Sequence, residues 1–153
     1  MASKTSRMQR PATYEDANLI LRLFELRREE KLRQARDWFF KNFHARTLEE
    51  FGKLCPHGSQ EHAYHRMVTS YWDMVSAFVE QRVLNNQLFF STNGENVAVW
   101  NKVKPWIEVV RSEMNRPTYL KNLESVAEKH LQWRQKQADE TSNIKGGHKK
   151  KKK

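Results

Sequence analysis

Several residue types that mark whole classes of protein are scarce in this chain of 153 residues. A single cysteine, Cys55, excludes a disulfide framework and a zinc site with several cysteine ligands. The chain has only five glycines and four prolines, and this small number argues against a β-sandwich, a propeller or a glycine-rich nucleotide fold. No apolar run exceeds four residues, so neither a membrane-spanning segment nor a secretory signal is expected. We therefore expect a reduced, cytoplasmic protein without a membrane span.

Aromatic residues, in contrast, are abundant. The chain has eight phenylalanines, five tryptophans and four tyrosines, far more than a disordered chain carries. A chain of this length buries about 68–70% of its extended surface on folding, so one core is sufficient.

The net charge of +10 lies mostly at the two ends. Residues 13–138 hold 19 basic and 16 acidic side chains, which nearly balance. The remaining basic residues precede residue 13 or follow residue 138. We predict a flexible basic leader over residues 1–12, one helical domain over 13–138 and a disordered lysine-rich tail over 139–153.

Helical periodicity runs through the central domain, and no alternating strand pattern competes with it. We expect long amphipathic helices over residues 13–43, 59–84, 93–115 and 118–137, with short helical turns near residues 48–54 and 88–90. Thr13, Thr47 and Ser59 stand at expected N-caps, and Thr92 has the spacing of a capping box with Glu95. The prediction is an all-α fold, a bundle of four long helices plus two short helical turns with flexible basic ends.

A set of motifs in this domain carries a family resemblance. The motifs are Thr13 to Leu23, Tyr71-Trp72-Asp73-Met74-Val75, Leu88-Phe89-Phe90, Asn93-Gly94-Glu95, Trp100, Arg111, Asn115-Arg116-Pro117 and Leu123-Glu124. Together they resemble the signature of an uncharacterised, all-helical bacterial family, a domain of unknown function. The resemblance covers about residues 13–137 and implies a helical fold but no activity. Some relatives have an N-terminal membrane-spanning helix, whereas Arg22, Glu25, Arg27 and Arg28 interrupt that region here.

The densest group of potential metal ligands is Cys55, His57, Glu61, His62 and His65. A metal ion needs three or four ligands converging at about 2.0–2.3 Å. We expect His62 on the polar face of its helix and His65 at the boundary of that face, and the Glu-x-x-His and His-Glu-x-x-His motifs are absent. His57, His62 and His65 are thus weak metal candidates, solvated histidines are favoured, and no cofactor is predicted.

His130 lies in the apolar stripe of the last helix, between Val126 and Trp133. A buried imidazole without hydrogen-bond partners costs about 1–3 kcal/mol. His130 is a weak candidate for a general base facing Glu124, Tyr71 or Asp73, and a core histidine with satisfied hydrogen bonds is favoured. An ion pair between Asp73 and Arg111, or one with Glu124, would fix the register of the helices rather than perform chemistry. No catalytic motif indicates an enzyme.

The first predicted helix has apolar residues on two sides. The predicted core face continues that of the second half of the helix and contains Ala17, Ile20, Leu21 and Phe24. The opposite side contains Leu19, Leu23 and Leu26. Exposed leucines indicate a homodimer or another protein partner. The equal alternative is that other helices of the same chain cover them.

The five terminal lysines, Lys149, Lys150, Lys151, Lys152 and Lys153, are a candidate polyanion site. If the five lysines contact five phosphates of duplex DNA, the logarithm of the binding constant should fall with the logarithm of the salt concentration at a slope of about −4.5. Such contacts would not read the base sequence. The alternative is a solvated tail without a ligand. The leading expectation is a helical scaffold or protein-interaction domain without catalysis. The second is a nucleic-acid-binding accessory protein that uses its basic termini.

Overall fold

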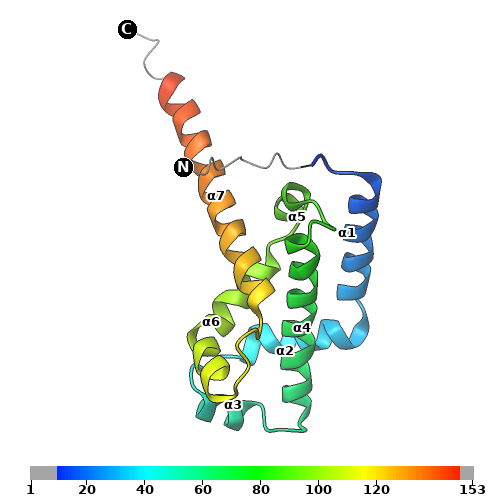
Figure 1. Ribbon diagram of the computed structural model, residues 1–153, viewed down its shortest axis with the longest axis vertical. Coiled ribbons are helices and arrows are strands. Elements are labelled where there is room, and N and C mark those ends of the chain that lie inside the picture. The colour runs from blue at the N-terminus through cyan, green and yellow to red at the C-terminus, as the bar shows by residue number, and fades with distance from the viewer. Residues whose placement is uncertain (1–9, 149–153) are drawn as a thin grey trace, which may run out of the picture.

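The computed structural model describes residues 10–148, with side chains as far as Ser142. Within that range the chain forms seven α-helices and no strand, which confirms the all-α prediction (Figure 1). The helices are α1 (Tyr14–Arg27), α2 (Glu30–Asn42), α3 (Leu48–Leu54), α4 (Gln60–Glu80), α5 (Asn86–Thr92), α6 (Glu95–Glu113) and α7 (Lys121–His148). None of these described helices is both long enough and apolar enough to cross a bilayer.

The central element is α4, against which α2 and α7 make their most extensive contacts (Figure 1). Helix α6 packs on α7 and on α4, and α1 stands at the edge of the molecule. Large aromatic side chains fill the space between these helices: Phe39, Phe43, Trp72, Phe89, Trp100 and Trp106 are all buried.

The single long helix predicted over residues 13–43 is wrong, because the chain bends at Arg28 and Glu29. The carboxylate of Glu29 accepts the backbone N–H of Leu32 at 3.0 Å and so begins α2. A guanidinium N–H of Arg36 in α2 donates to the carbonyl of Arg27 at 3.3 Å and so binds the last residue of α1. The bend contains no glycine or proline, so no local signal announces it.

This bend also corrects the face assignment of α1. Asp16 and Leu23 are buried, Leu19 and Ile20 are half-buried, and Leu21 is exposed. Leu19 and Leu23 were predicted on the exposed side, and Leu21 with Phe24 on the core side. The prediction assumed one continuous helix, in which the apolar face of the second half fixes the core face of the first half. Because α1 and α2 are separate helices, the core face of α2 does not determine that of α1. Leu26 is exposed, as predicted.

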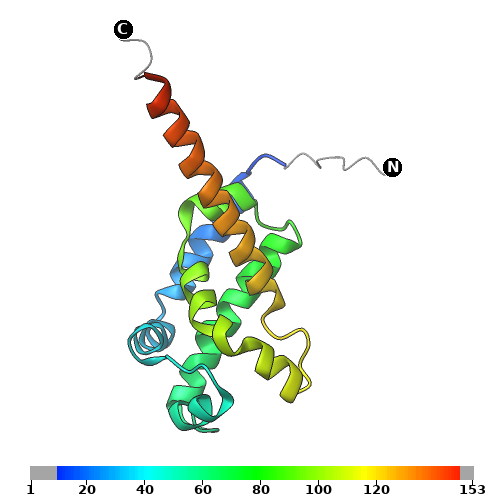
Figure 2. The same cartoon turned by 90° about the vertical axis from the view of Figure 1, so that its left-hand side faces the viewer.

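Helices α6 and α7 differ from their predicted ends. Thr92 lies in the last turn of α5, so the predicted capping box is wrong, and α6 begins after Gly94 without a side-chain cap. Helix α7 continues past Gln137 to His148, and its outer half leaves the body of the molecule (Figure 2). The terminal lysines Lys149–Lys153 lie outside the described residues.

Candidate functional site

A cavity of about 710 Å³ follows α4 on the side where α3, α6 and the α6–α7 connection meet it. Its volume falls within the range of about 300–1,000 Å³ that small-molecule sites occupy. We call it the α4 groove. The residues that line it are Phe51, His57, His62, His65, Arg66, Thr69, Ser70, Asp73, Met74, Ala77, Trp106, Val110, Met114, Arg116, Thr118, Tyr119, Leu120 and Asn122.

The deep part of the groove is aromatic, with two unpaired ring nitrogens. His65 and Trp106 are 1% and 2% exposed, and their ring centroids are 5.4 Å apart. Neither His65 Nε2 nor Trp106 Nε1 has a hydrogen-bond partner among the described residues. Burial lowers the pKa of His65 to about 3, so its imidazole is neutral at pH 7. An unpaired buried polar group costs about 1–3 kcal/mol, which makes this pair a conspicuous feature of the core.

The rim of the groove is basic. The guanidinium of Arg116 lies over the ring of Tyr119, 4.9 Å from its centroid. Burial raises the pKa of the Tyr119 phenol, and so does the negative charge of Asp73. The Thr69 side chain and the positive charges of Arg116 and Arg66 act in the opposite direction. Neither arginine forms an ion pair with a carboxylate in the described part of the chain. Two unpaired guanidinium groups from different elements thus act on one point.

The histidines proposed as weak metal ligands all line this groove but do not form a ligand set. The rings of His57 and His62 are 5.3 Å apart, whereas His65 is buried among Phe39, Phe43, Phe51 and Trp106 rather than at the helix boundary as expected. No group of three or more histidine, cysteine or acidic side chains in residues 10–142 is placed to hold a metal ion.

Two other members of the cluster have shifted pKa values. Burial raises the pKa of the Cys55 thiol to about 11, so the free side chain is a neutral thiol at pH 7. Burial, together with the charges of His57 and Arg66, lowers the pKa of His62.

His130 lies away from the α4 groove, in the core between α5, α6 and α7. Its ring stacks on Phe90 at 4.7 Å, and Nδ1 lies 3.2 Å from Oδ1 of Asn96, which is not one of the three predicted partners. Nε2 has no partner among the described residues, and burial lowers the pKa of His130 to about 4. We interpret it as a core histidine, because its side chain is fully buried and its ring packs on Phe90 and Trp133.

The polar residues of the family motifs connect helices to one another. Asp73 of α4 accepts the backbone N–H of Leu123 at 2.9 Å and so caps α7. Trp72 Nε1 donates to Glu95 at 3.2 Å, and Arg36 of α2 binds the same carboxylate. The predicted pair of Arg111 and Glu124 is confirmed, at 3.0 Å, whereas Asp73 takes no part in it.

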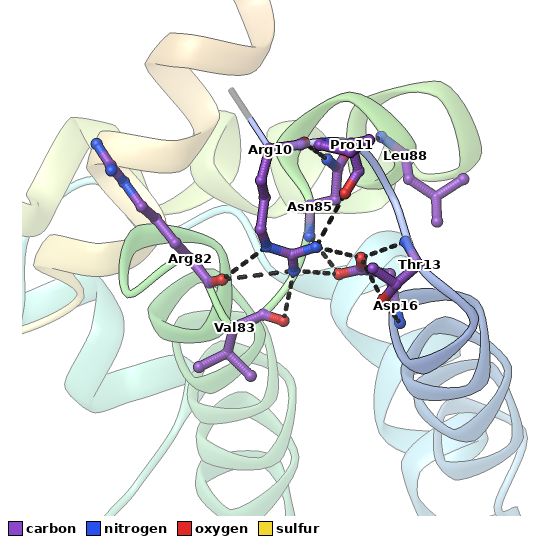
Figure 3. Close-up of polar contacts among 8 residues, drawn as sticks. All are labelled: Arg10, Pro11, Thr13, Asp16, Arg82, Val83, Asn85 and Leu88. Atoms are coloured by element: carbon purple, nitrogen blue, oxygen red, sulfur yellow. Dashed lines mark hydrogen bonds and ion pairs between the residues drawn. The ribbon is translucent and has the colours of Figure 1, made fainter. Parts of the chain in front are cut away.

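The most extensive polar network is one that sequence reasoning missed (Figure 3). The buried carboxylate of Asp16 accepts two hydrogen bonds of 2.6 Å from Arg10, together with the backbone N–H groups of Thr13 and Asn85, each at 2.8 Å. The Arg10 guanidinium holds the pKa of Asp16 well below its usual range. Arg10 also donates to the carbonyl of Val83 at 3.1 Å. Asn85 is 69 residues from Asp16, so no local spacing reveals the contact.

The comparisons with known proteins agree with the family motifs. A family described as a domain of unknown function (DUF4760) matches residues 12–133, from the approach to α1 as far as Trp133 of α7. This match confirms the resemblance to an uncharacterised helical family and leaves both basic ends outside. The comparisons with curated proteins and with solved structures find no similar protein.

Proposed function

The chain belongs to the family of the domain of unknown function DUF4760, and we propose that it acts as a non-catalytic helical interaction domain that pairs with a second copy of itself. The pairing surface is the outer face of α1, which consists of Tyr14, Ala17, Leu21 and Phe24. This face replaces the one that was predicted from the sequence.

The observation that carries the proposal is the exposure of this outer face. Tyr14, Leu21 and Phe24 are 88%, 61% and 45% exposed, on a helix at the edge of the molecule (Figure 1). The four residues follow one another at spacings of three, four and three, the a/d pattern of paired helices. A contiguous apolar surface of this kind is typical of a protein contact.

The order of side chain sizes favours a second copy as the occupant. A two-fold axis near Leu21 would bring two antiparallel α1 helices together, with the small Ala17 of one copy opposite the large Phe24 of the other. Leu21 would meet its own equivalent at the centre. Charges of both signs, Arg22, Glu25 and Arg28, flank this face, so no field of one sign opposes the pairing.

The test is the mass of the full chain in solution, with Leu21→Glu and Phe24→Glu combined in one variant. Light scattering should give a dimer for the unaltered chain and a monomer for the double variant. Both side chains point outward, so the helical circular dichroism should not change. Leu131→Glu on α7 is the matched control, because Leu131 is 41% exposed and lies far from α1 along the chain; it should remain dimeric.

A monomeric unaltered chain, or a double variant that stays dimeric, would overturn the proposal. Substitution of Leu23, the residue predicted from the sequence, is unsuitable for this test. Its side chain is buried, so a glutamate there would unfold α1 from the body rather than probe a surface.

A second candidate function, polyanion binding by the basic ends, is supported by the place of the charge in the chain. Lys149–Lys153 follow directly on α7, whose outer half leaves the body (Figure 2). Arg10, by contrast, is already paired with Asp16 and adds no free charge to such a contact.

A further inference from the structure

We propose that the α4 groove binds a small amphiphilic carboxylate, a molecule with one carboxylate head and an apolar body. This inference concerns a surface on α3, α4 and α6, and it is independent of the proposed pairing through α1. Three features of the groove point to this chemistry.

The first feature is the pair of guanidinium groups on the rim. Arg66 comes from α4 and Arg116 from the α6–α7 connection, and the charges of both act on the phenol of Tyr119. Neither has a carboxylate partner within the described residues, whereas Arg10, Arg36 and Arg111 all do. Guanidinium groups bind carboxylates through paired, charge-assisted hydrogen bonds. An anionic head placed at Tyr119 would accept hydrogen bonds from both arginines.

The carboxylate already in the lining does not compete for this role. Asp73 is the one acidic residue among those that line the groove. Its two oxygens accept the Leu123 N–H at 2.9 Å and the Asn122 side-chain amide at 3.3 Å, so they are committed to the start of α7. With two arginines and one aspartate in its lining, the groove carries a small excess of positive charge.

The second feature is the pair of unpaired nitrogens in the deep part of the groove. Trp106 Nε1 carries a proton and has no acceptor among the described residues, and His65 Nε2 has no partner there either. Both side chains are more than nine-tenths buried and both line the groove. Buried polar groups without partners are rare in folded proteins, and a bound ligand is one way in which they are satisfied. One oxygen of the carboxylate head would accept the Trp106 N–H, because the ring centroid of Trp106 lies 6.4 Å from that of Tyr119.

The third feature is the apolar surface within the lining. Met74 of α4 and Met114 after α6 are exposed at the edge of the groove, and Ala77 and Val110 lie in its lining. Methionine side chains adapt their shape to an apolar ligand. A hydrocarbon chain along these residues would cover both methionines while the carboxylate bound the arginines.

The experiment is a calorimetric titration of the full chain with decanoate, below its micelle concentration, and with decyltrimethylammonium as the matched cation. Decanoate should bind saturably at one molecule per chain, and the cation should bind at least tenfold more weakly. Arg66→Gln combined with Arg116→Gln should weaken decanoate binding at least tenfold. Arg33→Gln on α2, an exposed arginine outside the groove lining, should leave it unchanged.

A second variant, Trp106→Phe, keeps an aromatic ring and removes the N–H, so decanoate binding should weaken severalfold. Helical circular dichroism verifies that each variant is folded, and the arginine pair gives a result even where Trp106→Phe does not fold. Equal binding of the anion and the cation would overturn the assignment of a carboxylate. Absence of saturable binding, or binding unaffected by the arginine pair, would overturn the site itself.

Discussion

A buried carboxylate, that of Asp16, and a half-buried one, that of Glu95, fix the relative positions of segments far apart in this chain. Asp16 joins residues 10–13 to the α4–α5 connection, and Glu95 joins α6 to α2 and α4 through Arg36 and Trp72. Each accepts hydrogen bonds from donors on at least two segments. A buried carboxylate is tolerated only where its charge and its lone pairs are satisfied, so each of these contacts selects one arrangement of the segments it joins.

We expect Asp16→Asn to lower the free energy of unfolding at pH 7 by about 2 kcal/mol, because the variant loses its charge pairing with Arg10. The folded-state pKa of Asp16 lies below the unfolded value of about 3.9, so its stabilisation is present above about pH 4 and is lost as the pH falls further. Urea unfolding measured between pH 7 and pH 3 should therefore show that the difference in free energy of unfolding between the unaltered chain and the variant becomes smaller in acid.

Asp37→Asn provides the control for this measurement, because Asp37 forms an exposed pair with Lys41 on α2. Exposed pairs contribute at most about 1 kcal/mol, so this substitution should change stability little at any pH. A constant difference between the unaltered chain and Asp16→Asn across the whole pH range would contradict the assigned role of Asp16.

At the scale of elements, α7 depends on α4 for its beginning and its position. Asp73 caps its first turn from outside the helix, and Lys129 of α7 pairs with Glu80 at the end of α4 at 2.6 Å. Both Leu123 and Val126 are fully buried against the core. The motif Tyr71-Trp72-Asp73 therefore connects α4 to its neighbours, through Leu23 of α1, Glu95 of α6 and Leu123 of α7.

Asp73→Ala should lower the free energy of unfolding by about 1 kcal/mol, the usual cost of losing a helix cap. Urea unfolding followed by far-ultraviolet circular dichroism measures this change. Glu128→Ala, an exposed substitution on the same helix, should change stability much less. Equal effects of the two substitutions would show that the cap from α4 contributes nothing specific.

At the scale of the whole molecule, most of the net positive charge lies towards the two ends of the sequence. Arg10 is paired with Asp16 within the domain. The five lysines at residues 149–153 follow the domain in the sequence. If the second candidate function holds, this cluster governs the electrostatic part of any contact with a polyanion.

Replacement of all five lysines by glutamine in the full chain should reduce the log–log salt slope of duplex DNA binding by about 4.5, one counterion contribution for each lost phosphate contact. Fluorescence anisotropy with labelled duplex DNA at increasing salt measures the slope. The matched control replaces Lys41 and Lys53, which form exposed pairs on the body, and should change the slope little. Identical slopes for the unaltered chain and the tail variant would exclude the lysine cluster as the cause of binding.

Local chemistry, written in short stretches of sequence, determined the helices and most of the core. Thr13, Thr47 and Ser59 cap α1, α3 and α4 as predicted, because an N-cap needs only a hydroxyl within three residues of the backbone N–H that it accepts. The apolar stripe of α4 places Tyr71, Val75 and Val79 inward, since a periodicity of 3.6 residues is visible within one helix.

Only the tertiary structure decided where the first predicted helix bends, which side of α1 faces inward and which groups meet in the α4 groove. Arg36 reaches Glu95 across 59 residues, and Asp16 reaches Asn85 across 69. Such contacts depend on how whole helices pack, and α1 has apolar residues on both sides that fit either orientation locally. The unpaired nitrogens of His65 and Trp106 belong to the same category, because a missing hydrogen bond can be recognised only after every neighbouring side chain has taken its place.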